Sequence, residues 1–461
     1  MMLRRLYAVS PEFIKKTLRF VRSSFMPFPY DRGFEFARVY KKLMESQWYT
    51  REKLKEMQLL RLKDLLEHAY VNVPYYKRIF DDRGLKPSDI QSLEDLTKLP
   101  ILTKDTVRQH FNELVARNAD NFCPQLSHTT GSTQEPISYY LDRRLRIMTS
   151  ACVQRHWSWC GVNPNELIVV LRGTLIDEFG ERKKLLWRLL GNELHLSTFE
   201  MSDEVMAEYI KLLFTYRPSL IRGYPSSLEI LARFALENRL SMPNPRAIHT
   251  SSEVILPEQR KCIEMAFGAP LFDWYGHGES TVNAGECDHH KGLHVGLEYG
   301  YTEFIKTPET QNMDGVYNIV STSLWNYSMP LIRYDTEDLA LLGSEECTCG
   351  RGLPLIKAII GRRADIIEGV NGVKVGPSSF VHFWKYRIAE YLHGVNYIQI
   401  VQTAKDFIVI RLVGKKSLAN EKIIVEQVRQ LLGNMRIEFE YLSEVPTGQK
   451  WRFTVSEITS R

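Results

Sequence analysis

The chain is organised around the stretch Leu126-Ser127-His128-Thr129-Thr130-Gly131-Ser132-Thr133-Gln134-Glu135-Pro136. Residues 137–141, which follow it, alternate in the manner of a strand. Gly131 allows close approach of a backbone, and hydroxyls together with backbone N–H groups can donate hydrogen bonds to phosphate oxygens. The stretch lacks the G-x-x-x-x-G-K-[ST] pattern of a Walker loop. A Ser/Thr-rich surface loop remains the simpler interpretation, so the rest of the chain must decide.

Length and composition predict a globular protein with more than one domain. The chain has 461 residues, which exceeds the usual size of a single hydrophobic core. Hydrophobic residues make up 44% of it and charged residues 25%, as in ordinary globular proteins. The formal net charge of +5 is too weak to indicate a nucleic acid partner, and we expect none.

The sequence also bears on the compartment. It shows no apolar run long enough for a membrane span and no apolar core of a signal peptide. We therefore expect a cytoplasmic protein whose seven cysteines are thiols or metal ligands. Residues 1–26 combine apolar residues at helical spacing with arginines and lysines. They are expected to form a helix with a solvated basic face or, as the alternative, a peripheral contact with the inner face of a membrane.

Periodicity divides the chain into three parts. Residues 1–120 read as helices and carry no obvious chemistry. Within residues 121–361, short apolar runs such as 167–171 alternate with helical patterns such as 226–236, which predicts an α/β domain. Residues 362–461 form a smaller part of mixed pattern, long enough for an independent domain.

Motifs downstream of the opening stretch follow one another in a definite order. They are Arg222-Gly223-Tyr224-Pro225-Ser226-Ser227, Thr250-Ser251-Ser252-Glu253, Asp273-Trp274-Tyr275-Gly276-His277-Gly278-Glu279, Ile332-Arg333-Tyr334-Asp335-Thr336-Glu337-Asp338-Leu339, Gly361-Arg362-Arg363-Ala364-Asp365 and Pro446-Thr447-Gly448-Gln449-Lys450-Trp451-Arg452. In this order the chain resembles the ANL superfamily of adenylate-forming enzymes. It is most similar to the branch of phenylacetate–coenzyme A ligase-like proteins, including those of capsular polysaccharide gene clusters. The resemblance covers nearly the whole chain and implies an α/β fold, with a large multi-subdomain adenylation domain and a small mobile α+β domain at the C-terminus.

The resemblance implies a binding site for ATP. It places Tyr275 against adenine, where a π-face gives stacking, and Asp338 on both ribose hydroxyls with Arg362 nearby. Without its motif, Asp338 would read as a cap or turn residue. The nucleotide-binding residues expected in this way are Ser127, Thr129, Thr130, Gly131, Ser132, Thr133, Ser252, Glu253, Tyr275, Gly276, Asp338 and Arg362.

Two residues are expected to act in catalysis. Glu279 matches the carboxylate that holds Mg²⁺, an ion that usually needs one or two protein carboxylates beside the phosphates. Lys450 matches the lysine of the mobile domain that neutralises charge between the substrate carboxylate and the α-phosphate. Outside its motif, Lys450 would read as an exposed lysine. Asp365 is similar to the hinge acid about which the C-terminal domain rotates.

The chain departs from the pattern of the family at three places. Gln134 and Glu135 stand where glycine is usual, Gly278 replaces a threonine, and Glu337 replaces the glycine before Asp338. We interpret these changes as drift within an active enzyme. The alternative from another class is a catalytically reduced nucleotide-binding or scaffold protein, against which the retained Lys450 argues.

The cysteines suggest a second site. Cys347-Thr348-Cys349 is a tight C-x-C, and Cys287 lies upstream with His289, His290 and His294. Three thiolates and an imidazole would complete a closed, structural Zn²⁺ site. With the resemblance as a guide, the expected ligands are Cys287, His294, Cys347 and Cys349, with His290 as the competing histidine and a metal-free cysteine pair as the alternative. The remaining cysteines are expected in the core, namely Cys123, Cys152, Cys160 and Cys262.

The expected function is that of an ATP-dependent ligase. It activates a carboxylate, small or on a glycan, as an acyl-adenylate and passes it to an acceptor. An amine acceptor in surface polysaccharide modification is preferred, and coenzyme A is the alternative. The acid pocket is expected near Arg155, Trp157, Arg172, Arg222 and Trp274. Its arginines would suit an anionic or sugar substrate, or else serve as ordinary packing arginines.

Overall fold

The computed structural model describes residues 33–129, 136–164, 166–172, 185–188, 193–198, 201–343, 347–362, 365–375, 388, 397–414, 416–443 and 453–457. The chain forms two compact units. Unit 1 comprises Met1–Glu303, Val320–Thr336 and Gly343–Lys357, and unit 2 comprises Phe304–Ile319, Glu337–Leu342 and Ala358–Arg461. The predicted α/β class is confirmed, whereas the predicted domain boundaries and the mobility of the C-terminal domain remain predictions.

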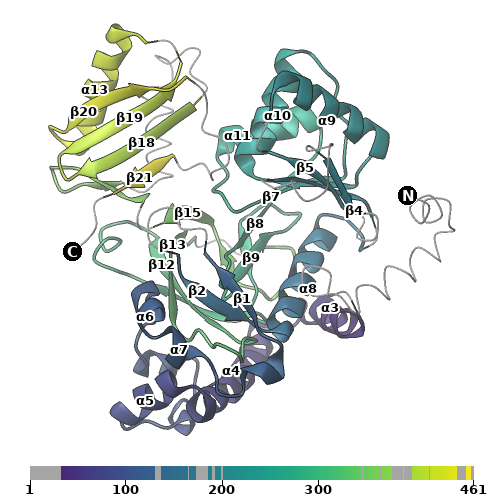
Figure 1. Ribbon diagram of the computed structural model, residues 1–461, viewed down its shortest axis with the longest axis vertical. Helices are drawn as coiled ribbons and strands as arrows, with labels where there is room; N and C mark the ends of the chain where they lie inside the picture. Colours follow the sequence, from purple (N-terminus) through teal and green to yellow (C-terminus); the bar gives the residue numbers. More distant parts are fainter. Residues whose placement is uncertain are drawn as a thin grey trace. The chain divides into compact units, whose positions relative to one another are not determined.

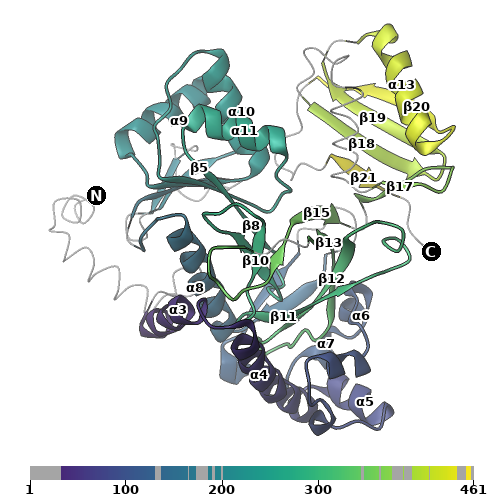
Figure 2. The same cartoon turned by 180° about the vertical axis from the view of Figure 1, so that it is seen from behind.

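Helices dominate the N-terminal part of unit 1, where α4, α5, α6 and α7 lie together (Figures 1 and 2). Thr50 caps α4 by accepting a hydrogen bond from the Lys53 backbone N–H at 3.3 Å. Val73 is extended because Pro74 follows it, so α4 ends there and Pro74 begins α5. The helices and short 3₁₀ turns are α3 (Phe34–Ser46), α4 (Arg51–Asn72), α5 (Pro74–Asp82), η1 (Pro87–Asp89), η2 (Glu94–Lys98), α6 (Lys104–Gln109), α7 (Phe111–Leu114) and η3 (Ala119–Phe122).

A hairpin of β1 (Gln125–His128) and β2 (Ser138–Leu141) follows these helices. Its buried Tyr139 packs in the same core as Leu62 of α4, Tyr76 of α5 and Tyr334 of strand β13. The hairpin is therefore held firmly on the helical part, and the two ends of the opening stretch are fixed in place.

A nine-stranded mixed sheet forms the centre of unit 1. Strands β8, β7, β6, β3 and β5 are parallel neighbours in that order, and antiparallel strands extend both edges. In sheet order the strands are β14 (Leu355–Ile356), β10 (Leu293–Val295), β9 (Asn283–Glu286), β8 (Leu271–Gly276), β7 (Ala247–Ser251), β6 (Leu220–Gly223), β3 (Ile168–Arg172), β5 (Glu193–Ser197) and β4 (Leu185–Arg188).

Helices cover both faces of this sheet. Successive side chains of a strand point to opposite faces, so each strand contributes to a core on either side. Val169 and Leu171 of β3 pack in one core with residues of α9 (Asp203–Tyr216), α10 (Pro225–Glu237) and α11 (Pro257–Phe267). These three helices lie together on one side of the sheet (Figure 1). Ile168 and Val170 face the other way and pack with Trp157 of α8 (Arg143–Trp159). Side chains of the sheet that point to the same face as Val170 therefore lie on the side covered by α8.

Unit 2 contains a sheet of order β20-β19-β18-β21 with α13 (Leu418–Leu432) on it. Ile400, Ile408 and Leu412 of the sheet pack against Ile424 and Val428 of α13. The strands of this sheet are β18 (Tyr397–Ala404), β19 (Phe407–Val413), β20 (Arg436–Tyr441) and β21 (Thr454–Ser456).

A second four-stranded sheet has the order β11-β12-β13-β15, and the chain passes between the two units within β11, β12 and β13. Its strands are β11 (Gly300–Ile305), β12 (Val316–Ser323), β13 (Tyr334–Leu341) and β15 (Ala358–Arg362), and the short pair β16 (Ile367–Glu368) and β17 (Lys374–Val375) lies in unit 2. Among the described residues, no helix has the length and apolar content needed to cross a membrane. The expected basic helix of residues 1–26 lies outside the described part of the chain.

Candidate active site and a cysteine–histidine cluster

The β1–β2 hairpin presents the expected phosphate-binding stretch. Thr129 closes its neck, because its backbone N–H donates to the Ile137 carbonyl and its hydroxyl accepts from the Ile137 N–H, both at 3.0 Å. Ser127 lies opposite Tyr139 in the hairpin register. Thr130, Gly131, Ser132 and Thr133, with Gln134 and Glu135, lie outside the described residues.

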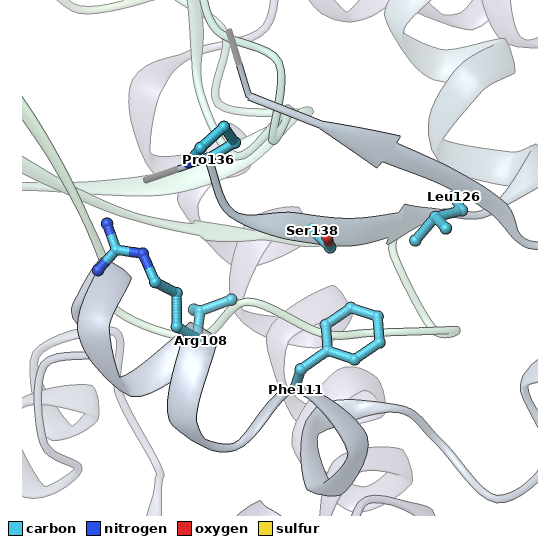
Figure 3. Close-up of a pocket in the computed structure, with 6 residues that line it drawn as sticks. Arg108, Phe111, Leu126, Pro136 and Ser138 are labelled. Atoms are coloured by element: carbon cyan, nitrogen blue, oxygen red, sulfur yellow. The ribbon is translucent and has the colours of Figure 1, made fainter. Parts of the chain in front are cut away.

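A cavity of 320 Å³ lies against this hairpin (Figure 3). Arg108 of α6 and Phe111 of α7 extend towards Pro136 and Ser138 (Figure 3). Leu126 and Val107 complete its lining. None of the expected nucleotide-binding residues that the structure describes lines this cavity, and the sequence did not predict it.

Glu279 is buried beyond the end of β8 and is held by two partners. Tyr334 donates a hydrogen bond to its Oε1 at 2.6 Å, and His277 Nδ1 lies 2.9 Å from its Oε2. Burial opposes ionisation, but the charge of His277 and the hydrogen bonds from His277 and Tyr334 outweigh it and lower the pKa of Glu279 to about 2. Glu279 therefore offers a fixed negative charge at neutral pH, which suits a cation such as Mg²⁺.

Tyr139 explains why residue 278 is glycine. A Cβ atom on Gly278 would overlap the hydroxyl oxygen of Tyr139, whereas Tyr139 Cζ would lie at an ordinary 3.5 Å. Burial, together with the charge of Glu279, raises the pKa of Tyr139, so this hydroxyl keeps its proton. A tyrosine hydroxyl from the hairpin thus occupies the space in which the family pattern has a threonine side chain.

The expected adenine-side residues gather at the carboxyl ends of β7 and β8, the edge at which parallel sheets bind ligands. Tyr275 is buried and lies opposite Ala284, and Gly276 lies opposite Asn283. Ser252 has φ +75°, a strained value for a residue with a side chain. Glu253 accepts two hydrogen bonds at 3.0 Å from the N–H and hydroxyl of Ser226, in the first turn of α10.

The expected ribose and hinge residues lie together in unit 2. Asp338 and Arg362 are opposite each other in the β13–β15 pair, with Arg362 Nε 3.6 Å from Asp338 Oδ1. The Arg362 N–H donates to Asp365 Oδ2 at 3.2 Å, and the Asp365 carbonyl accepts from Thr454 at 2.8 Å. Asp365 therefore connects the end of β15 to β21, while Lys450 lies outside the described residues.

Two side chains decide between expectations. Arg155 takes the packing role that was the alternative to a place in the acid pocket, because it is buried and pairs with Glu298 at 2.7 Å. Cys123 is exposed rather than in the core, because it ends the turn η3 with φ +52° at the surface. Cys152 and Cys160 are buried as predicted, and Cys262 is partly buried.

The structure brings the four expected metal ligands together. The ligand atoms of Cys287, His294, Cys347 and Cys349 all lie within 4.8 Å of one another. His294 Nδ1 lies 3.0 Å from the Leu353 carbonyl, to which its N–H donates, so Nε2 faces Cys349 at 3.4 Å with its lone pair free. His290, the competing histidine, lies 3.0 Å from Glu286 instead.

Known proteins resemble the chain over most of its length. No family model matches the chain. Protein CapK of Staphylococcus aureus is 24% identical over 424 residues, which cover 87% of this chain and 89% of CapK. The phenylacetate–coenzyme A ligase of Thermus thermophilus is 28% identical over 342 residues, which cover 71% of this chain and 75% of the ligase.

A solved structure shows the same fold. The 2-hydroxyisobutyryl-CoA ligase, in its postadenylation state with an acyl-AMP, has a TM-score of 0.66 and 20% identity, covering 87% of this chain and 89% of that one. Over about 70% of its length the chain is similar to phenylacetate–coenzyme A ligases. The relatives named here thus support the resemblance to the ANL superfamily that the order of motifs indicated.

Three residues that had no expected role lie against the expected site residues. Tyr334 and His277 hold Glu279, and Tyr139 abuts Gly278. Tyr334 and His277 stand within quoted motifs, so their position was a usable signal. Tyr139 stands in a strand, and nothing in its immediate sequence distinguishes it from a core tyrosine.

Proposed function

We propose that this protein uses ATP to activate a carboxylic acid as an acyl-adenylate and then transfers the acyl group to an acceptor. A carboxylate oxygen of the acid attacks the α-phosphorus of ATP, and the bond from that phosphorus to pyrophosphate breaks. The single observation that supports this proposal most is Glu279, a buried carboxylate kept ionised beside the hairpin of the expected phosphate-binding stretch.

Four of the expected residues have a specific role in this proposal. Mg²⁺, when bound, would neutralise the phosphates, and the ionised Glu279 would hold it. Tyr275 would lie against adenine, and Asp338 would accept from the ribose hydroxyls. Lys450 would stabilise the charge that develops between the acid and the α-phosphate. The fit of Glu279 to a divalent cation rests on its low pKa and its buried, fixed orientation.

An exchange assay tests the proposal. The protein, incubated with ATP, a panel of carboxylic acids and labelled pyrophosphate, should return label to ATP in an acid-dependent manner. Glu279→Gln should lower that rate about 100-fold, because it removes a charge aimed at the reacting phosphates. Glu56→Gln, at an exposed position of α4, should leave it unchanged. ATP binding without exchange for any acid would favour the scaffold alternative instead.

The acceptor is the finer part of the proposal. Coenzyme A is favoured because the named ligase relatives act with it. An amine acceptor in polysaccharide modification is the second candidate, first expected from the likeness to capsule-associated members. Supplying the activated acid with coenzyme A in one arm and with an amine in the other separates them, because only the true acceptor gives a stable thioester or amide.

We further propose that Cys287, His294, Cys347 and Cys349 hold a structural Zn²⁺. Three thiolates and one imidazole, each from the protein, leave no open position for chemistry. The purified protein should contain one zinc per chain, and Cys347→Ser should lose it while Cys123→Ser keeps it. Removing zinc should lower the free energy of unfolding by about 2 to 3 kcal/mol when free zinc is a hundredfold above Kd. A metal-free wild type of equal stability would contradict this site.

We also propose that the protein is cytoplasmic and that residues 1–26 make a peripheral contact with the inner face of a membrane. Flotation of the full-length chain with anionic vesicles, compared with a chain lacking residues 1–26, tests the contact. Equal flotation of the two would remove it.

A further inference from the structure

A polar cluster lies on the α8 side of the central sheet, at the carboxyl ends of its parallel strands. Val170, Arg222 and His249 are neighbours in register across β3, β6 and β7, so their side chains share one face. Arg172 and Ser251 stand two residues further along β3 and β7 and share that face. The motifs expected to bind the nucleotide begin at the next positions, so this cluster borders the expected site of adenylation.

Arg172 is a partly buried cation at the end of β3. Among the described residues no carboxylate oxygen forms an ion pair with it, and its buried Nε has no hydrogen-bond partner. Its Nη2 donates to Ser251, and the guanidinium lies 5.2 Å from the Tyr224 ring centre. Burial lowers the pKa of Arg172, which shows the cost of keeping this charge out of water.

Glu253 and Glu193 are the carboxylates whose charges act on Arg172, and both form hydrogen bonds or close contacts with other residues. Glu253 accepts both hydrogen bonds from Ser226, and Glu193 lies 3.0 Å from His195. Arg155, also in unit 1, differs from Arg172 because it forms an ion pair with Glu298 at 2.7 Å. A purely structural role would call for such a partner at Arg172 as well.

His249 supplies an acceptor beside this cation. His156 Nε2 donates to the Glu286 carbonyl at 2.8 Å, so His156 Nδ1 carries a lone pair and accepts from His249 Nε2–H at 3.1 Å. That order of donors leaves His249 Nδ1 as an acceptor, and this buried atom has no hydrogen-bond partner in the described part of the chain. Burial first, then His156 and the arginines, lowers the pKa of His249, so the ring stays neutral.

Aromatic side chains close the cluster. The Arg222 guanidinium lies 5.4 Å from the Trp157 ring centre, and Trp157 meets His249 edge to face at 6.4 Å. Arg222 thereby adds a second positive charge to the same sheet face. The combination of cations, one neutral acceptor and aromatic walls matches a small polar anion rather than an apolar acyl chain.

We propose that the acid activated by this protein carries a second negatively charged group, held by Arg172, and a hydroxyl that donates to His249. This inference rests on the proposed adenylation and names the class of its substrate, a hydroxylated dicarboxylic acid. We therefore expect the protein to activate such dicarboxylic acids faster than acids whose acyl group is uncharged.

Pyrophosphate exchange with matched acids tests the inference. Malate carries both features, succinate lacks the hydroxyl, and butyrate and phenylacetate lack the second charge. We expect exchange with malate to exceed that with butyrate by at least about tenfold, the usual weight of one hydrogen bond to a charged group. Arg172→Met should remove that preference, Arg172→Lys should keep part of it, and His249→Leu should abolish only the difference between malate and succinate.

The outcomes separate the two proposals. Exchange supported by butyrate or phenylacetate but not by the dicarboxylates would overturn this inference and leave adenylation standing. Exchange with no acid would overturn both. A second readout guards against misfolding: malate should raise the melting temperature of the wild type but not of Arg172→Met, whose melting temperature without acid should match the wild type. Equal stabilisation of the two by malate would also overturn the inference.

Discussion

At the scale of single residues, Gly278 and Tyr139 form a steric pair. Threonine at residue 278 would place its Cβ on the Tyr139 hydroxyl, so Gly278→Thr should lower the free energy of unfolding by about 1 to 3 kcal/mol. Pyrophosphate exchange should fall with it, because Glu279 is the next residue. Adding Tyr139→Phe should recover most of both losses, since the remaining ring carbon lies at 3.5 Å. Additive losses in the double variant, measured by urea unfolding, would disprove the coupling.

Glu337 has a backbone conformation that lowers the stability of the fold. Its φ of +62° lies in the left-handed region, where a side chain is unfavourable by about 1 kcal/mol relative to glycine. Glu337→Gly should therefore raise the free energy of unfolding by about 1 kcal/mol. Glu337→Ala is the matched control, because it removes the carboxylate but keeps the strain and should give no gain. An equal gain in the free energy of unfolding of both variants, measured by chemical denaturation, would show that the carboxylate charge, not the backbone strain, causes the effect.

At the scale of elements, His156 of α8 and His249 of β7 join a helix to the sheet. Burial lowers the pKa of His156 to about 4, below the 6.5 of an exposed histidine. Between these values the unfolded chain binds a proton that the native chain does not, so stability falls as pH falls. The loss from pH 6.5 to pH 5 should be about 2 kcal/mol for this group.

Urea unfolding at several pH values checks this dependence. His156→Gln should flatten the fall in stability between pH 6.5 and pH 5, whereas His128→Gln, at an exposed position of the hairpin, should leave it as steep as in the wild type. A slope unchanged in His156→Gln would show that this ring is not held neutral.

Several elements were predictable because their signals are local. The apolar run 167–171 predicted a strand, which is β3 (Ile168–Arg172), and the helical pattern of 226–236 lies within α10 (Pro225–Glu237). The cysteine–histidine cluster followed from spacing and resemblance, and the geometry agrees with it. Arg155 could not be assigned from sequence, because its partner Glu298 is 143 residues away. The same holds for Tyr139, whose role depends on the fold bringing β2 against residue 278.

At the scale of the whole molecule, the two chemical steps should depend differently on Lys450. Lys450→Ala should lower formation of the acyl-adenylate about 100-fold, since it removes a charge needed only in that step. Transfer from a supplied acyl-adenylate to the acceptor should keep its rate. Single-turnover measurements of pyrophosphate release and of product formation check the two steps. Unchanged pyrophosphate release would show that the lysine has another role.

The central claim is that the oxygen of a carboxylic acid becomes bonded to the α-phosphorus of ATP. The most direct measurement follows that oxygen, by incubating the protein with ATP, the acceptor and the acid labelled with ¹⁸O in its carboxylate. Mass spectrometry should find one labelled oxygen in the AMP released and none in the pyrophosphate. Label in orthophosphate, or unlabelled AMP alongside product, would contradict activation by adenylation.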